Sequence, residues 1–241
     1  MQNHYFCTIN LQVMFSKIQK YLRILLVFFF ASTILSVVVL KWCPVYVTPL
    51  MFIRAVQQMS RGEKIRMKHH WVSMDGEMSI YMPVAVMASE DQRFLQHHGF
   101  DFTEIGKVIE ERASGKRLRG GSTISQQVAK NVFLWPGKSW IRKGLEAYFT
   151  VLIELIWGKH RIMEVYLNSI EMGDGIYGAD AVAWQNFGRP ASQLTRPNCA
   201  LIAATLPNPL KYSSLEPSCY MLRRQSQIMS QMRHIDVFPA Q

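Results

Sequence analysis

Seventeen consecutive uncharged residues, Ile24–Leu40 (ILLVFFFASTILSVVVL), constrain this chain more than any other feature. At ~1.5 Å of rise per residue, such a helix is slightly shorter than a ~30 Å hydrocarbon core, and Leu22 extends it. Trp42 follows as an aromatic residue suited to the membrane interface. We therefore predict a transmembrane anchor over residues 24–42.

The charges before this run predict its orientation. Lys17, Lys20 and Arg23 precede it, and basic residues favour the cytoplasmic side. We expect residues 1–23 in the cytoplasm and residues 43–241 across the membrane. A cleaved signal peptide and a buried core helix are the alternatives. No small-x-small cleavage pattern follows Leu40, which favours an uncleaved anchor.

The segments after the anchor carry apolar residues at helical spacing, and none alternates like a strand for long. An all-α or mainly α domain is therefore predicted. The predicted helices cover residues 49–59, an amphipathic segment near the membrane, then 83–89, 123–132, 140–157, 159–168, 178–187, 197–206 and 222–232. We expect an exposed basic connector containing His69 and His70, and a basic loop over residues 112–121.

The formal net charge of +10 would attract nucleic acid, anionic lipid or a phosphorylated substrate. Because no nucleic-acid-binding motif accompanies the charge, we expect no nucleic-acid partner. Cys199 and Cys219 can form a disulfide in an oxidising compartment or remain two unpaired thiols, and both alternatives stay open.

Glu90 is the first candidate for catalysis. It ends the apolar helix predicted over residues 83–89 and lies near Phe94, and partial burial there would raise its pKa towards that of a general base. A solvated helix end is the alternative that the local sequence favours. Adjacent histidines cannot easily bind one metal ion, so we expect structural hydrogen bonds from His97, with Asp91 orienting the loop.

The segment GGSTISQQVAKN, residues 120–131, predicts a second polar site. Thr123 and Gln126 match a capping box, and the free amide groups at the start of a helix favour an anion. Ser122 adds a hydroxyl there, and Gln127 and Lys130 share one helix face. The spacing is not that of a P-loop.

A third polar cluster precedes and includes Glu146. Lys138, Arg142 and Lys143 supply cations, and Arg142 and Glu146 are spaced i,i+4. On a surface helix, such pairs are usually solvated and contribute little to stability.

Taken together, EDQRFLQHHG, GGSTISQQVAKN, RKGLE and KHRIMEVYLN resemble, in this order, the motifs of the peptidoglycan glycosyltransferases. The resemblance covers residues 49–232. It implies a lysozyme-like fold, and it is closest to the monofunctional members because no SxxK or KTG motif of a transpeptidase domain is present.

The resemblance implies that lipid II is polymerised into β-1,4-linked glycan, with inversion at C1 of the donor MurNAc and release of undecaprenyl pyrophosphate. Glu90 would be the catalytic base, with Asp91, Phe94 and His97 in support. Glu146 would be the second catalytic carboxylate, which orients the cations or a divalent metal near the pyrophosphate. The substrate-binding residues would be Ser122, Thr123, Gln126, Gln127, Lys130, Lys138, Arg142 and Lys143.

The same resemblance places the protein in the bacterial inner membrane, with its catalytic domain in the periplasm. Its partners would be lipid II, the growing glycan strand, the membrane and other cell-wall synthesis or division proteins. No organic cofactor is expected; a divalent cation, Mg or Mn, is allowed, with its ligands unassigned.

Two other functions remain as alternatives. A lytic transglycosylase or lysozyme-type enzyme shares the fold and a single acid but needs no pyrophosphate site, so the cations from Lys130 to Lys143 favour synthesis. A non-catalytic membrane-anchored scaffold would need neither acid.

Overall fold

The computed structural model describes residues 2–115 and 121–239. Residues 116–120, which belong to the basic loop expected over residues 112–121, lie outside the described part. The chain divides into two compact units, residues 1–42 and 43–241. Each unit is described by itself.

The first unit is one long helix, α1 (Gln2–Leu40). It begins well before residue 24, where the predicted anchor starts, because no Pro or Gly interrupts the preceding segment of mixed polar and apolar residues. It ends two residues before residue 42, and Pro44 follows. Its segment Met14–Leu40 is long and apolar enough to cross a membrane. Only 6% of the most apolar part of this segment is buried. The alternative of a buried core helix is therefore contradicted, and a membrane anchor or a signal sequence remains.

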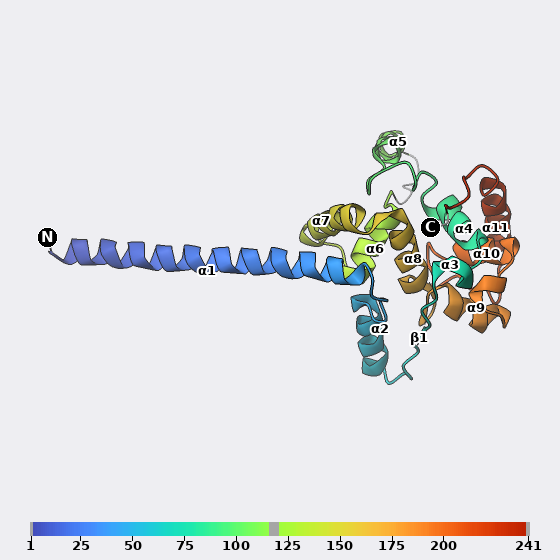
Figure 1. Ribbon diagram of the computed structural model, residues 1–241, viewed down its shortest axis with the longest axis horizontal. Helices are drawn as coiled ribbons and strands as arrows, with labels where there is room; N and C mark the ends of the chain where they lie inside the picture. Colours follow the sequence, from blue (N-terminus) through green and yellow to red (C-terminus); the bar gives the residue numbers. More distant parts are fainter. Residues whose placement is uncertain (1, 116–120, 240–241) are drawn as a thin grey trace. The chain divides into compact units, whose positions relative to one another are not determined.

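The second unit is mainly helical, as predicted, with a small sheet (Figure 1). Its elements are α2 (Pro49–Ser60), β1 (Lys68–His69), α3 (Met74–Glu77), α4 (Tyr81–Glu90), α5 (Phe102–Ala113), α6 (Ile124–Phe133), α7 (Trp140–Ile156), α8 (Gly158–Ser169), β2 (Glu171–Gly173), β3 (Ile176–Tyr177), α9 (Ala179–Phe187), the 3₁₀ turn Ala191–Gln193, α10 (Arg196–Ala203) and α11 (Cys219–Gln231).

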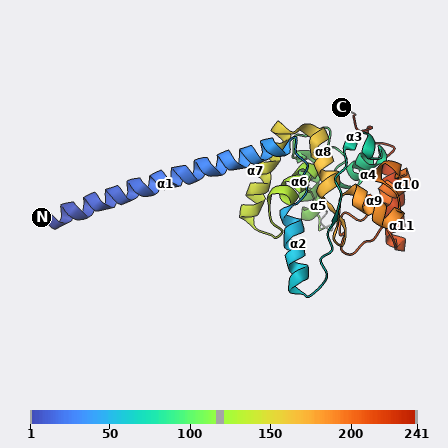
Figure 2. The same cartoon turned by 60° about the horizontal axis from the view of Figure 1, so that its bottom comes forward.

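Helix α4 lies at the centre of this unit. Residues 82–88 are all buried, as expected for a helix that is apolar on every side. Pro83 lies in the first turn, where its missing N–H costs no hydrogen bond. Helix α4 packs against α8 and α10, α8 also contacts α6, and α10 also contacts α11. In Figures 1 and 2, α4 and α8 therefore lie between α6 and α7 on one side and α10 and α11 on the other.

Three short strands form a sheet that the sequence did not predict. Their order is β1-β3-β2, with β1 parallel and β2 antiparallel to β3. Strands of two or three residues are too short for alternation to be visible in a sequence. Gly175, at φ +68°, makes the turn between β2 and β3, and a Cβ there would lie 2.3 Å from the Arg66 carbonyl oxygen.

The prediction of an exposed connector was wrong for His69. This residue lies in β1 and is half-buried, and its Nε2 is 2.9 Å from the Asn168 carbonyl oxygen. Burial lowers the pKa of His69, so the ring stays neutral near neutral pH and donates to this carbonyl. His70 is exposed as expected, although its Nδ1 lies 2.8 Å from Asp180.

The two candidate disulfide partners are both free thiols. Cys199 is fully buried in α10, and burial raises the pKa of its thiol to about 12. Cys219 is exposed at the start of α11. The disulfide alternative is therefore contradicted, and Cys199 packs as a small apolar residue.

Candidate active site

Glu90 lies at the end of α4, where the helix leaves the core. Its carboxyl oxygens accept hydrogen bonds from the Gln127 amide (3.1 Å) and the Ser89 hydroxyl (3.2 Å). Burial raises the pKa of Glu90, although these hydrogen bonds and the nearby Arg224 guanidinium oppose the rise. The alternative interpretation, that Glu90 is a solvated residue at a helix end, is therefore wrong, because Glu90 is half-buried. A carboxylate with a raised pKa is a better proton acceptor near neutral pH.

Asp91, Phe94 and His97 form a buried frame beside Glu90. The Asp91 carboxylate lies 3.0 Å from the His97 Nε2 and accepts the N–H of Ile124 at 3.0 Å. The Phe94 ring meets the His97 ring edge-on, with centroids 6.2 Å apart. The structural hydrogen bond predicted for His97 is thus confirmed, and the frame ties the end of α4 to the start of α6.

The start of α6 has the predicted capping box. The Thr123 hydroxyl accepts the N–H of Gln126, and the Gln126 side chain accepts the N–H of Thr123. Two of the amides expected to favour an anion are already occupied within the protein, one of them by the Asp91 carboxylate. The N–H of Ile124 already donates to Asp91, and that of Gln126 donates to Thr123. Thr123 and Gln126 are buried, so their polar groups hold this loop in place, whereas Ser122 is exposed.

Glu146 does not form the solvated ion pair expected on a surface helix. Its side chain is only 3% exposed, and its two carboxyl oxygens accept hydrogen bonds from Arg142 (2.6 Å) and Lys143. The Arg142 side chain is 11% exposed, whereas that of Lys143 is 45% exposed. The pattern could not reveal this burial, because it arises where α7 packs against α6 and α8.

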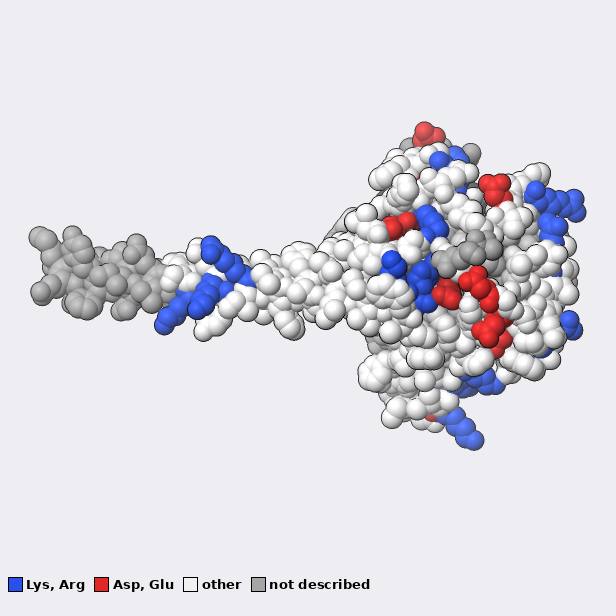
Figure 3. Space-filling view, viewed as in Figure 1, with Lys and Arg blue, Asp and Glu red and all other residues white. Residues whose placement is uncertain are grey.

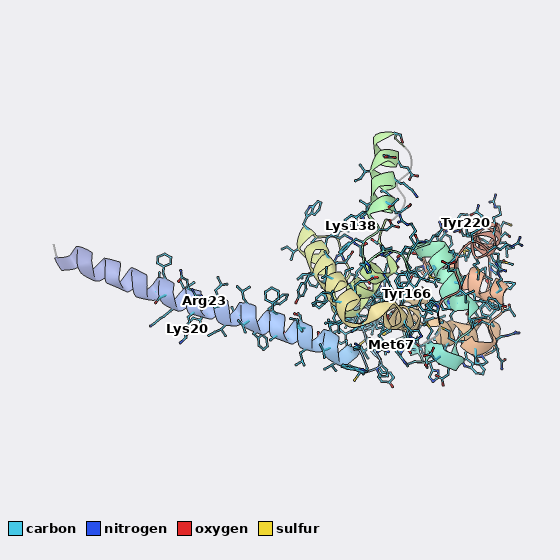
Figure 4. All side chains as sticks on the ribbon, turned by 45° about the horizontal axis from the view of Figure 1, so that its top comes forward. Lys20, Arg23, Met67, Lys138, Tyr166 and Tyr220 are labelled. Atoms are coloured by element: carbon cyan, nitrogen blue, oxygen red, sulfur yellow. The ribbon has the colours of Figure 1, made fainter. Side chains whose placement is uncertain are left out.

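Lys130 of α6 interacts electrostatically with both acids of the site. Glu146 and Glu90 favour its charged form, whereas the charges of Arg142 and Lys143 oppose it. Burial lowers the pKa of Lys130, so its ammonium group is incompletely solvated. Such a cation gains more from an incoming anion than a fully hydrated one does. Lys138 lies in the exposed segment before α7 (Figure 4).

A cavity of about 1140 Å³ opens beside Glu90. Asp91, Ser122 and Gln127 line it on the side of α4 and α6, whereas the opposite wall comes from α11. That wall contributes Tyr220, Arg223, Arg224, Gln227 and Gln231. Acidic and basic side chains lie side by side on one face of the domain, with further basic groups near α11 (Figure 3). The volume is large enough for a substrate of several rings.

Comparison with known proteins identifies the family of this chain. The family model described as Transglycosylase matches residues 56–233. The chain belongs to the transglycosylase family.

Its relatives include three proteins named biosynthetic peptidoglycan transglycosylase. The protein of Bacteroides thetaiotaomicron is 60% identical, over 92% of this chain and 90% of its own. The protein of Caulobacter vibrioides is 50% identical, over 88% and 91%. The protein of Pseudomonas aeruginosa is 45% identical, over 92% and 94%.

The sequence analysis of this transglycosylase did not predict that residues of α11 form part of the site. The Arg224 guanidinium donates to the Ser89 carbonyl oxygen at 3.4 Å and interacts with the charge of Glu90. The adjacent pair Arg223 and Arg224 was visible in the sequence. Nothing local, however, indicated that residues more than 130 positions away face Glu90.

The sequence analysis left open a divalent cation at the site, but the surroundings of Glu146 do not fit one. Both oxygens of Glu146 are occupied by cationic side chains. Among the described side chains, no group of three or more His, Cys, Asp or Glu residues can hold a metal ion. Mg²⁺ and Mn²⁺ prefer several oxygen ligands, which this cationic surrounding does not supply.

Proposed function

We propose that this chain is a membrane-anchored enzyme that polymerises lipid II into β-1,4-linked glycan. Membership of the transglycosylase family makes it a peptidoglycan glycosyltransferase. One observation carries the finer proposal: Glu90, a half-buried carboxyl with a raised pKa, lies on a cavity and within electrostatic reach of Lys130. Lys130 in turn interacts with Glu146 and with the two cations that Glu146 binds.

Glu90 acts as the general base in this proposal. It takes the proton from the 4-hydroxyl of the GlcNAc of the acceptor lipid II, and that oxygen attacks C1 of the MurNAc that ends the growing strand. The C1–oxygen bond to the pyrophosphate breaks as the new bond forms, so C1 inverts. Undecaprenyl pyrophosphate departs, and Glu90 returns its proton to water.

The leaving pyrophosphate gains negative charge, and Lys130, Arg142 and Lys143 are the cations proposed to stabilise it. Glu146 holds two of them in place through its hydrogen bonds. Lys138, which is exposed before α7, is proposed as a further cation for the pyrophosphate. Ser122 and Gln127 would contact sugar or phosphate, whereas Thr123 and Gln126 would act through the loop they hold.

The membrane brings the enzyme to its substrate in this proposal. Helix α1 is the single-pass anchor in the bacterial inner membrane, with residues 1–23 in the cytoplasm and the catalytic domain in the periplasm. Phe52, Val56 and Met59 of α2 are exposed apolar side chains suited to contact with lipid. Tethering confines the search for lipid II to two dimensions. Other cell-wall synthesis or division proteins are further proposed partners.

The test is polymerisation of labelled lipid II by the full chain in detergent. Glu90→Gln should lose on the order of 10²–10⁴-fold of the rate, whereas Glu63→Gln, a change at an exposed carboxyl, should keep it. Near-full activity of Glu90→Gln would reject Glu90 as the base. Cleavage of finished glycan without polymerisation would identify a lytic enzyme, and neither activity in the wild type would indicate a scaffold.

A further inference from the structure

A chain of two hydrogen bonds runs from a buried tyrosine in the core to Glu90. The Tyr166 hydroxyl of α8 donates to Gln127 Oε1 at 3.2 Å, and Gln127 Nε2 donates to Glu90 Oε2 at 3.1 Å. Tyr166 is only 1% exposed, whereas Gln127 lines the cavity. Figure 4 shows Tyr166 inside the domain, among the helices. Gln127 and Glu90 therefore face the cavity, whereas Tyr166 does not line it.

The direction of these hydrogen bonds follows from the chemistry of the groups. A glutamine amide offers an oxygen that only accepts and a nitrogen that only donates. Burial and the nearby charge of Glu90 raise the pKa of Tyr166 well above its ordinary value, so the phenol keeps its proton and donates it. With Oε1 held by Tyr166, the amide nitrogen faces Glu90. In the opposite orientation of the amide, Oε1 would face the Glu90 carboxylate, and two oxygens that only accept cannot form a hydrogen bond.

We propose that Tyr166 is a positioning residue for the reaction, which fixes the Gln127 amide as a hydrogen-bond donor to the carboxylate of Glu90. This inference rests on the proposed role of Glu90 as the base. A donated hydrogen bond favours the ionised carboxylate, which is the form that accepts a proton. Hydrogen bonds in a chain also polarise one another, so the Tyr166 bond strengthens the one to Glu90.

Other charged and titratable groups also face Glu90. They are Asp91 beside it, Lys130 of α6 and Arg224 of α11. The two cations favour the ionised form of Glu90, and Asp91 opposes it. None of these groups has a hydrogen bond to Tyr166 among the described contacts, so removing the phenol hydroxyl leaves their charges in place.

The experiment compares Tyr166→Phe with Tyr177→Phe in full-length protein, with kcat/KM for lipid II measured from acidic to alkaline pH. Tyr177 is a matched control: it is also 1% exposed, and its hydroxyl bonds a different acid, Glu171, at 3.4 Å. A weakened hydrogen bond to Glu90 raises the pKa of the base. Tyr166→Phe should therefore be about threefold slower on the acidic limb of the profile, the size expected for one net hydrogen bond, with recovery on the alkaline plateau.

Tyr177→Phe should leave the shape of the profile unchanged. An equal loss at every pH in Tyr166→Phe, or an unmoved acidic limb, would overturn the proposal, because a purely structural defect lowers the amount of active enzyme without moving a titration. Glu90→Gln separates the two proposals. If that variant remains active, Glu90 is not the base; if it is inactive and the Tyr166→Phe limb is unmoved, only the positioning role fails.

A measurement on the wild type covers the case in which Tyr166→Phe does not fold. In protein labelled with ¹⁵N-glutamine, the side-chain amide signal of Gln127 is assigned by its loss in Gln127→Met. The proton donated to Glu90 should exchange with solvent more slowly than the second amide proton, and its chemical shift should follow the titration of Glu90. A rapidly exchanging amide, or one indifferent to pH, contradicts a fixed donor.

Discussion

The two acids of the site should respond to neutralisation with opposite changes in stability. Glu146→Gln removes a buried carboxylate whose partner Arg142 is itself only 11% exposed. Among the residues that the structure describes, the Arg142 Nε already has no hydrogen-bond partner, so the guanidinium would remain buried with little compensation. Lys143 is 45% exposed and can turn to water, so it adds little to the loss.

Breaking a buried ion pair by removing one partner typically costs about 3–5 kcal/mol, and the exposure of Lys143 favours the lower value. For a unit of this size, about 3 kcal/mol corresponds to a Tm lower by roughly 6–12 °C. Thermal unfolding in detergent, followed by circular dichroism at pH 7, measures this change. An unchanged Tm would contradict the buried pair.

Glu90→Gln should instead raise the Tm at neutral pH. The pKa of Glu90 is raised in the folded state, so its ionised form is held there at a cost in stability. Below the ordinary pKa of a carboxyl, Glu90 is protonated in both the folded and the unfolded state, so this cost is absent. The cost develops as the pH rises through the raised pKa of Glu90 in the folded state. The advantage of Glu90→Gln should therefore vanish in acid, and a Tm below the wild type at every pH would refute the reasoning.

Three further changes have definite expected outcomes. Asp91→Asn should lower the Tm, because it weakens the bond to the N–H of Ile124 at the start of α6, and the wild-type Tm would rule out this role. Gly178→Ala should unfold the domain at lower temperature, since φ is +85° and a Cβ would lie 2.7 Å from the Asn168 carbonyl oxygen; an unaffected melting curve is incompatible with that contact. Lys130→Met should slow polymerisation by ~10²-fold or more, whereas the exposed Lys64→Met should not, and equal rates would exclude Lys130 from charge stabilisation.

The helices were predictable because their signals are local. The capping box of Thr123 and Gln126, the apolar run before Glu90 and the spacing of α7 each lie within one or two turns of chain. The three-stranded sheet was not predictable, since its strands are too short to alternate and β1 pairs with a segment over one hundred residues later. For the same reason, the sequence did not reveal that His69 is half-buried.

The sequence by itself determined the apolar helix α1, the mainly helical domain and the four motifs that resemble the family later matched by residues 56–233. The tertiary structure alone decided the state of the acids. Whether Glu90 is desolvated, and whether Glu146 is buried between cations, depends on which helices pack around them. Because desolvation and hydrogen bonding act over a few ångströms in space, residues as distant in sequence as Arg224 influence the chemistry of Glu90.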